Sequence, residues 1–234
     1  MVTENAQEWL HELGGPQNIS DTLDTLRQLT PDRWHVLIVE IFEEKLQLGK
    51  PFWELCCALN LFARRRAPVK YLEIGVRRGK SMAQVACNSR DCDITGFDAW
   101  ISTYAHVENP GPDFVAWEMQ RLGHRGNLEL ISGDTQKTLP QFPRNHPEDL
   151  FDLATIDGDH SEEGAMRDLR NVAPRIASGG LLVFDDLTNP NCPQPESGNT
   201  FKKSFTLTLC FTRIWTIIKV LALRYAIRSK FHVD

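Results

Sequence analysis

The sequence predicts an α/β fold in which a mainly parallel sheet carries helices on both faces. Five short apolar segments are typical of strands, and helical patterns follow most of them: residues 69–75, 93–98, 127–132, 150–156 and 180–185. Strands that alternate with helices form parallel sheets. A glycine-bearing turn follows the first segment and acidic residues follow later ones. Together these features indicate a Rossmann-like, doubly wound sheet whose ligand lies at the carboxyl ends of the strands.

The chain before the first strand is expected to form an N-terminal helical cap over residues 1–66. An apolar stripe at helical spacing predicts one of its helices: Trp34, Leu37, Ile38, Ile41 and Phe42. Pro31 and Pro51 precede the starts of two helices, and residues 63–68 join the cap to the first strand. We therefore expect a cap (1–66), a Rossmann-like core (67–200) and a C-terminal element (201–234).

The first strand runs into the turn YLEIGVRRGKS at residues 71–81, in which Glu73, Gly75 and Gly79 have the spacing E-x-G-x-x-x-G. Gly75 can adopt backbone angles closed to other residues, and Gly79 lets the backbone pass close to a ligand. Helix amides begin near Lys80 and Ser81 and are expected to face the pocket. A tight turn that holds no ligand is an equally open alternative.

The second strand ends at Asp98, about 20 residues after the turn, where open α/β sheets place a carboxylate on ribose hydroxyls. An aspartate that caps a turn is the alternative. The spacing of the glycine turn differs from the G-x-G-x-x-G of dinucleotide sites, because Val76 and Arg77 follow Gly75. The glycine turn and Asp98 together favour a site that binds a nucleoside.

Two acidic segments flank the helix expected within residues 151–187, and we call their four aspartates the acidic corner: Asp157, Asp159, Asp185 and Asp186. Gly179 and Gly180 are predicted to end that helix. A right-handed crossover brings the carboxyl ends of the two flanking strands to one edge of the sheet. Four clustered carboxylates either take up protons or hold a cation, and a hard ion such as Mg²⁺ or Ca²⁺ suits oxygen ligands.

These motifs resemble class I S-adenosylmethionine-dependent methyltransferases. The turn E-x-G-x-x-x-G is similar to their first motif, and IDGDH followed by FDD is similar to the acidic segments of small-molecule O-methyltransferases of the macrolide and aminocoumarin tailoring type. The resemblance covers residues 69–187. It implies that S-adenosylmethionine is bound by a set of seven residues: Glu73, Gly75, Gly79, Ser81, Asp98, Gly133 and Asp134.

The same resemblance implies the catalytic groups. Asp157, Asp185 and Asp186 would hold a metal such as Mg²⁺, and Asp159 would be the general base. The tailoring enzymes usually carry an aromatic residue after IDGD, where this chain has His160, so His160 is a second candidate base. Alternatively, Asp159 caps the following helix, since Asp159-x-x-Glu162 has the spacing of a capping box.

We therefore expect O-methylation of a small-molecule hydroxyl, assisted by a divalent metal. An NAD(P)-dependent oxidoreductase and a non-catalytic binding module with this fold are the alternatives. The net charge of −5 and the absence of a basic cluster interleaved with aromatics disfavour nucleic acid as a partner. A homodimer is conceivable.

Six cysteines without a C-x-x-C pair, and an N-terminus without a signal-peptide pattern, indicate a cytoplasmic protein with reduced thiols. Residues 99–112 carry Trp100, Tyr104 and His106, which form either a lid over the acceptor or local packing. Alternation at 205–212 predicts a strand. Residues 214–227 form a further strand or a helix, too short and too charged to be inserted stably in a membrane.

Overall fold

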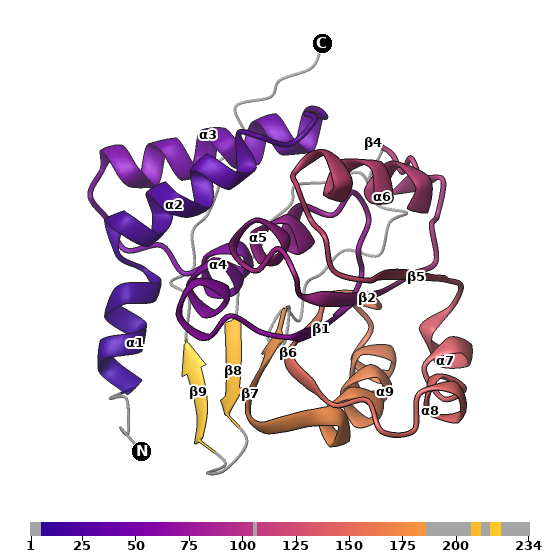
Figure 1. The fold of residues 1–234 in the computed structure, drawn as a ribbon. Helices are drawn as coiled ribbons and strands as arrows, with labels where there is room; N and C mark the ends of the chain where they lie inside the picture. The colour runs from indigo at the N-terminus through magenta and orange to yellow at the C-terminus, as the bar shows by residue number, and fades with distance from the viewer. Residues whose placement is uncertain (1–5, 105–106, 186–206, 212–215, 221–234) are drawn as a thin grey trace.

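A computed structural model of the chain describes residues 6–104, 107–185, 207–211 and 216–220. It confirms the Rossmann-like α/β fold. Seven strands form one sheet in the order β5-β2-β1-β6-β7-β8-β9 (Figure 1). Five of them are parallel: β1 (Lys70–Ile74), β2 (Asp93–Asp98), β5 (Leu128–Ser132), β6 (Phe151–Ile156) and β7 (Ile176–Phe184). β8 (Leu207–Phe211) and β9 (Thr216–Val220) add an antiparallel edge.

The register of the central strands brings their carboxyl ends to one level. Ile74 of β1 pairs with both Phe97 of β2 and Ile156 of β6, and Ile156 pairs with Phe184 of β7. The residues that follow these strands therefore lie side by side along one edge. This edge is where an open α/β sheet binds its ligand.

Four helices precede the sheet: α1 (Ala6–Leu13), α2 (Pro16–Leu26), α3 (Arg33–Gln47) and α4 (Leu55–Arg66). The later helices are α5 (Lys80–Asn88), α6 (Pro112–Arg121), α7 (Thr135–Thr138), α8 (Phe142–Asn145) and α9 (Glu162–Val172), with a 3₁₀ turn, η1, over Ala173–Arg175. Two short antiparallel strands, β3 (Thr103–Tyr104) and β4 (Val107–Glu108), lie in the segment considered as a lid. His106 lies outside the described residues.

The sheet divides the core into two hydrophobic layers because its strands are buried on both faces. One layer joins Tyr71 and Val183 of the sheet to Leu26 of α2 and Leu59 of α4. The other packs Leu72 and its sheet neighbours against α8 and α9. Figure 1 shows α4 and α5 on one side of the sheet and α9 on the other. The N-terminal helices therefore share a core with the sheet. The division at residue 66 stays a prediction.

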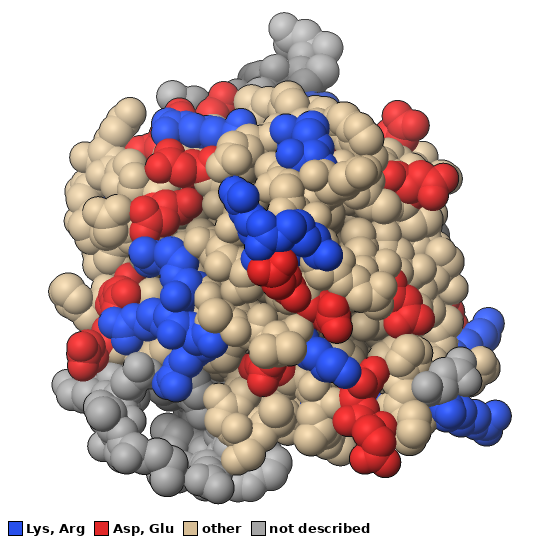
Figure 2. Space-filling model, viewed as in Figure 1, with Lys and Arg blue, Asp and Glu red and all other residues tan. Residues whose placement is uncertain are grey.

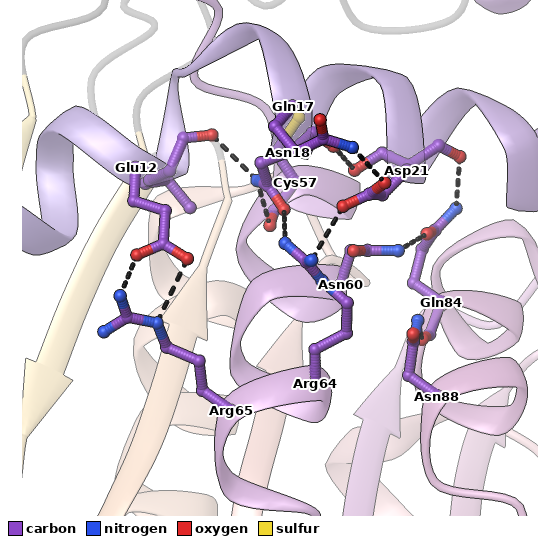
Figure 3. A network of polar contacts seen from close by, with 12 residues as sticks. Glu12, Gln17, Asn18, Asp21, Cys57, Asn60, Arg64, Arg65, Gln84 and Asn88 are labelled. Carbon is purple, nitrogen blue, oxygen red and sulfur yellow. Dashed lines mark hydrogen bonds and ion pairs between the residues drawn. The ribbon is translucent and has the colours of Figure 1, made fainter.

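Buried polar contacts also tie the N-terminal helices to α5 (Figure 3). Asn60 of α4 donates from Nδ2 to Oε1 of Gln84 in α5 at 2.9 Å, and Gln84 donates to the carbonyl of Thr22 in α2 at 3.3 Å. Asn18 of α2 donates to the carbonyl of Cys57 in α4 at 2.9 Å. Because paired polar groups in a core require specific geometry, these bonds set how the helices lie on one another.

One local prediction about a helix is confirmed and another is wrong. The apolar stripe lies in a helix as predicted, α3, although only Phe42 of the stripe is fully buried and Leu37 is 37% exposed, because α3 packs on α2 and not on the sheet. The helix α9 ends at Val172, well before Gly179, because Pro174, two residues further on, cannot continue the hydrogen-bonding pattern. Gly179 instead lies within β7, where the pairing with β6 is irregular.

At the C-terminal end β8 and β9 extend the sheet, so residues 207–211 form the predicted strand and residues 216–220 form a strand as well. In the part of the chain that the structure describes, no helix is long and apolar enough to cross a membrane. On the face shown in Figure 2, lysine and arginine side chains lie among aspartate and glutamate side chains. This face therefore carries no extended positive surface of the kind that binds nucleic acid.

Candidate functional site

The turn after β1 has a backbone that only glycine permits at its first position. Gly75 has φ +87°, and a Cβ placed there would overlap the carbonyl oxygen of Asp157. Gly79 has φ +75° and begins α5 without a capping side chain, so this helix start presents backbone amides and no side-chain cap. A Cβ at Gly79 would lie 3.1 Å from Met119 Cε, which shows that its small size also lets α6 pack closely.

Glu73 lies beneath this turn and is fully buried. Its carboxyl group accepts hydrogen bonds from the hydroxyl groups of Ser81 and, at 3.1 Å, Tyr71. Burial raises the pKa of Glu73 to about 8; the two hydrogen bonds lower it, and the charges of Asp157 and Asp98 raise it further. Glu73 and Ser81 thus contact each other inside the protein, where they join β1 to α5. Their predicted contact with the donor is untested.

Asp98 holds the turn together from the end of β2. Its Oδ2 accepts from the backbone N–H of Arg77 and its Oδ1 from that of Trp100, both at 2.6 Å. Arg77 and Trp100 both have positive φ, +51° and +50°, which is unfavourable for residues other than glycine and is often found at functional sites. Asp98 therefore caps the turn, as the alternative interpretation predicts. A carboxylate offers about four acceptor positions, so two remain for ribose hydroxyls.

Gly133 and Asp134 lie next to Asp98 at the same edge. Gly133 donates its N–H to the carbonyl of Asp98 at 2.9 Å and has φ +132°. Asp134 caps the short helix α7 by accepting from the N–H of Gln136 at 2.9 Å. The structure thus brings Gly75, Asp98 and Gly133 together along the ends of β1, β2 and β5.

The described members of the acidic corner follow β6 and β7. Asp157 donates its N–H to the carbonyl of Ile74, and Asp185 donates its N–H to that of Ile156, so both continue the sheet ladder by one residue. Both side chains are half-buried. Asp186 lies outside the described residues. Among the described residues there is no group of three His, Cys, Asp or Glu side chains arranged to hold a metal ion.

Asp159 and His160 are exposed and precede α9. The helix is capped by Ser161, which accepts from the N–H of Gly164 at 3.1 Å, so the alternative in which Asp159 is the cap is wrong. Asp159 instead accepts from the N–H of Ser161 at 2.9 Å, and its carboxylate fills the space where Gly164 lacks a side chain. The roles of Asp159 and His160 as bases stay predictions.

At or near this edge the sequence does not single out Glu54 or Asp168, and it points to Lys80 only through its backbone amide. Lys80 is the first residue of α5, and Glu54 caps α4 beside it. Asp168 of α9 is fully buried; burial raises its pKa to about 6, with Asp159 and Asp134 adding to the rise and a hydrogen bond to Thr135 opposing it. An acidic residue among the apolar positions of α9 was the available signal for Asp168. No local sequence pattern predicts the ion pair between Lys80 and Glu54.

Comparison with known proteins agrees with this geometry. Residues 72–187 match a family model described as a methyltransferase domain. None of the curated protein sequences matches the chain.

Several solved structures resemble the chain. Cofactor-bound Rv0187 from MTB is 22% identical, with a TM-score of 0.43, over 54% of this chain and 52% of that one, so the match spans about half of that protein. The apo form of TDP-rhamnose 3'-O-methyltransferase, an enzyme in calicheamicin biosynthesis, is 20% identical over 81% of this chain and 82% of that one, with a TM-score of 0.49. The O-methyltransferase TomG from Streptomyces achromogenes is 18% identical over 82% and 81%, with a TM-score of 0.48.

Proposed function

Because the chain contains an S-adenosylmethionine-dependent methyltransferase domain of class I over residues 72–187, we propose that it transfers the methyl group of this donor to a hydroxyl oxygen of a small molecule. The domain match does not select the acceptor. Hydroxyl methylation is proposed because acidic groups that accept protons, Asp157, Asp159 and Asp185, lie at or next to the ligand-binding edge of the sheet.

The proposed donor site is supported mainly by Asp98. This residue ends β2 beside the turn at Gly75, fixes that turn by accepting a hydrogen bond from the N–H of Arg77, and keeps acceptor positions for ribose hydroxyls. The methyl donor's ribose has both hydroxyl groups, which a carboxylate binds well. A pyrophosphate would instead need closer backbone approach and a second glycine at the position of Arg77. The NAD(P)-dependent alternative is therefore the weaker of the two.

In the proposed reaction the acceptor oxygen attacks the methyl carbon in line with the carbon–sulfur bond. The new C–O bond forms as the C–S bond breaks, sulfur keeps the electron pair, and the hydroxyl proton passes to a base. Asp159 and His160 are the proposed bases, because both follow β6 at the carboxyl edge. Positioning of donor and acceptor supplies much of the rate acceleration, and little covalent chemistry by the protein is needed.

The metal-assisted form of this reaction would use Asp157, Asp185 and Asp186 as ligands, and a divalent ion there would acidify the acceptor hydroxyl. Asp186 lies outside the described residues, so this set of three ligands stays a prediction. The methyl-transfer step balances with or without a metal. A homodimer stays a prediction.

Calorimetry with S-adenosylhomocysteine, the demethylated product, tests the donor site. We expect the wild-type protein to bind it, and Asp98→Ala to lose at least about tenfold in affinity because the ribose contact and the turn are both lost. Asp93→Ala is the matched control, since Asp93 begins the same strand and also accepts from a backbone N–H, that of Asn127 at 2.8 Å, at the opposite edge. Binding of NAD(P) without S-adenosylhomocysteine would refute the proposal.

A further inference from the structure

Two consecutive arginines, Arg77 and Arg78, lie in the turn between β1 and α5 at the ligand-binding edge, and we call them the arginine pair. Both side chains are half-buried. The guanidinium of Arg78 lies over the ring of Phe114 in α6, 4.4 Å from its centroid, which fixes its direction. The chain entering α3 is joined to α6, because the N–H of Thr30 donates to Oε1 of Glu118 at 2.6 Å (Figure 1). Two positive charges therefore lie where the turn, α3 and α6 meet.

The arginine pair shares one carboxylate oxygen, Oδ2 of Asp32. Nη2 of Arg77 lies 3.5 Å from this atom and Nε of Arg78 lies 3.4 Å from it. The other oxygen of Asp32, Oδ1, is used elsewhere, because it accepts from the N–H of His35 at 2.6 Å as the cap of α3. Within the described part of the chain, Oδ2 of Asp32 and both Nε and Nη2 of Arg77 are buried without a hydrogen-bond partner. The contacts are therefore ion pairs without hydrogen-bond geometry.

One shared oxygen atom does not satisfy two guanidinium groups. Each guanidinium presents five N–H donors in a planar fork, which matches the spacing of two oxygens of a carboxylate or phosphate. Buried donors that lack an acceptor destabilise the arrangement. An anionic group with two or more oxygens, supplied by a ligand, would pair with the donors that Asp32 leaves unbonded. Asp32 would then be its competitor, because both carry negative charge toward the same two side chains.

Given the proposed methyl transfer, on which this inference rests, we propose that Arg77 and Arg78 bind a phosphoryl or carboxylate group of the acceptor molecule. The acceptor is then an anion, and the arginine pair selects it without taking part in the chemical step. The donor's own carboxylate suits the arginine pair less well. It lies beside an ammonium group on the same carbon atom, and two guanidinium groups would repel that ammonium group.

Inorganic pyrophosphate, titrated by calorimetry into the protein with S-adenosylhomocysteine present, tests the anion site without a known acceptor. We expect the wild-type protein to bind it and Arg78→Gln to bind at least about tenfold more weakly. Asp32→Asn should bind at least about threefold more tightly, because the competing charge is lost. Asparagine caps a helix as well as aspartate does, so α3 keeps its cap. A gain in affinity is also an effect that a damaged fold does not produce.

The matched control is the exposed pair of Arg125 and Asp91, whose two bonds of 2.8 and 2.7 Å lie before the start of β2, at the opposite edge of the sheet. Arg125→Gln and Asp91→Asn should leave pyrophosphate affinity unchanged.

Three results would each overturn the inference: no pyrophosphate binding by the wild-type protein, an Asp32→Asn variant that binds no more tightly, or an equal gain in Asp91→Asn. An equal loss of S-adenosylhomocysteine affinity in Arg78→Gln would also overturn it, because the anion would then be the donor's carboxylate. Failure of the proposed function is seen separately, because the wild-type protein would then not bind S-adenosylhomocysteine, whereas the order of pyrophosphate affinities would be unchanged.

Discussion

At the scale of single residues, Glu73 shows that a residue of a sequence motif can serve the structure of the fold. The sequence places it at the end of a buried strand, and the fold surrounds its carboxyl group with two hydroxyl donors. Such a group is protonated in the folded protein at pH values where it is ionised in the unfolded chain. The acid therefore stabilises the fold mainly in its neutral form.

This predicts a pH dependence of stability. Because the pKa of Glu73 is raised to about 8 from an unfolded value near 4.5, its contribution is present in full below pH 4.5 and is lost as the pH rises through 8. The free energy of unfolding of the wild-type protein should fall over this window relative to that of Glu73→Gln, by several kcal/mol in total. Urea unfolding of both proteins at a series of pH values measures the difference.

The comparison of the two proteins removes the effects of other titrating groups, such as Asp168, since these groups are present in both. Parallel curves for the two proteins between pH 5 and 8 would show that Glu73 is ionised in the fold.

At the scale of elements, the contact between α4 and α5 positions the ligand-binding turn. The helix α5 begins at the glycine turn, and its middle is tied to α4 by the bond between Asn60 and Gln84, both of which are buried. The same two helices meet again at their starts, where Lys80 contacts Glu54. The N-terminal helices thus support the site from one side.

Asn60→Ala should destabilise the protein by about 1–3 kcal/mol, because Gln84 Oε1 then loses its donor in a buried environment. Chemical denaturation at constant pH measures the change. Gln17→Ala is the control, since Gln17 makes its bond to Asp21 on the surface and should change stability by less than about 0.5 kcal/mol. Equal effects of the two substitutions would mean that the buried bond adds nothing specific.

At the scale of the whole molecule, the N-terminal helices and the sheet share one hydrophobic layer. Tyr71 of β1 lies in the same cluster as Leu26 of α2 and Leu59 of α4. Two regions that bury their apolar surface against each other unfold together when neither has a separate core. We therefore expect a single cooperative unit, in spite of the change in pattern at residue 66.

Leu26→Ala tests this cooperativity. Leu26 is fully buried in α2, and its truncation should cost about 2–5 kcal/mol. If the unit is single, hydrogen exchange of the β1 amides should accelerate by an amount that corresponds to the same free energy. Leu48→Ala is the control, because Leu48 is 52% exposed and should leave exchange in β1 unchanged. Unaltered exchange in β1 of Leu26→Ala would instead mean that the helices unfold separately.

Much of the fold and part of the candidate site could be predicted from the sequence, because both depend on patterns local in the chain. Hydrophobic periodicity located the five parallel strands, and the glycine and acidic residues that follow them converge because parallel strands share a carboxyl edge. Gly75 was recognisable from its neighbours alone. The family resemblance rested on these same segments and is confirmed by the domain match over residues 72–187.

Tertiary packing decided what each side chain contacts. The cap of α9 is Ser161 and not Asp159, since two nearby residues compete for one helix end and small differences in backbone direction select one. Asp98 reaches the amide of Arg77 because β2 lies beside β1 in the sheet, and Lys80 meets Glu54 because the helix α4 lies against α5. Such contacts join residues distant in the chain, and a one-dimensional pattern does not specify their distances.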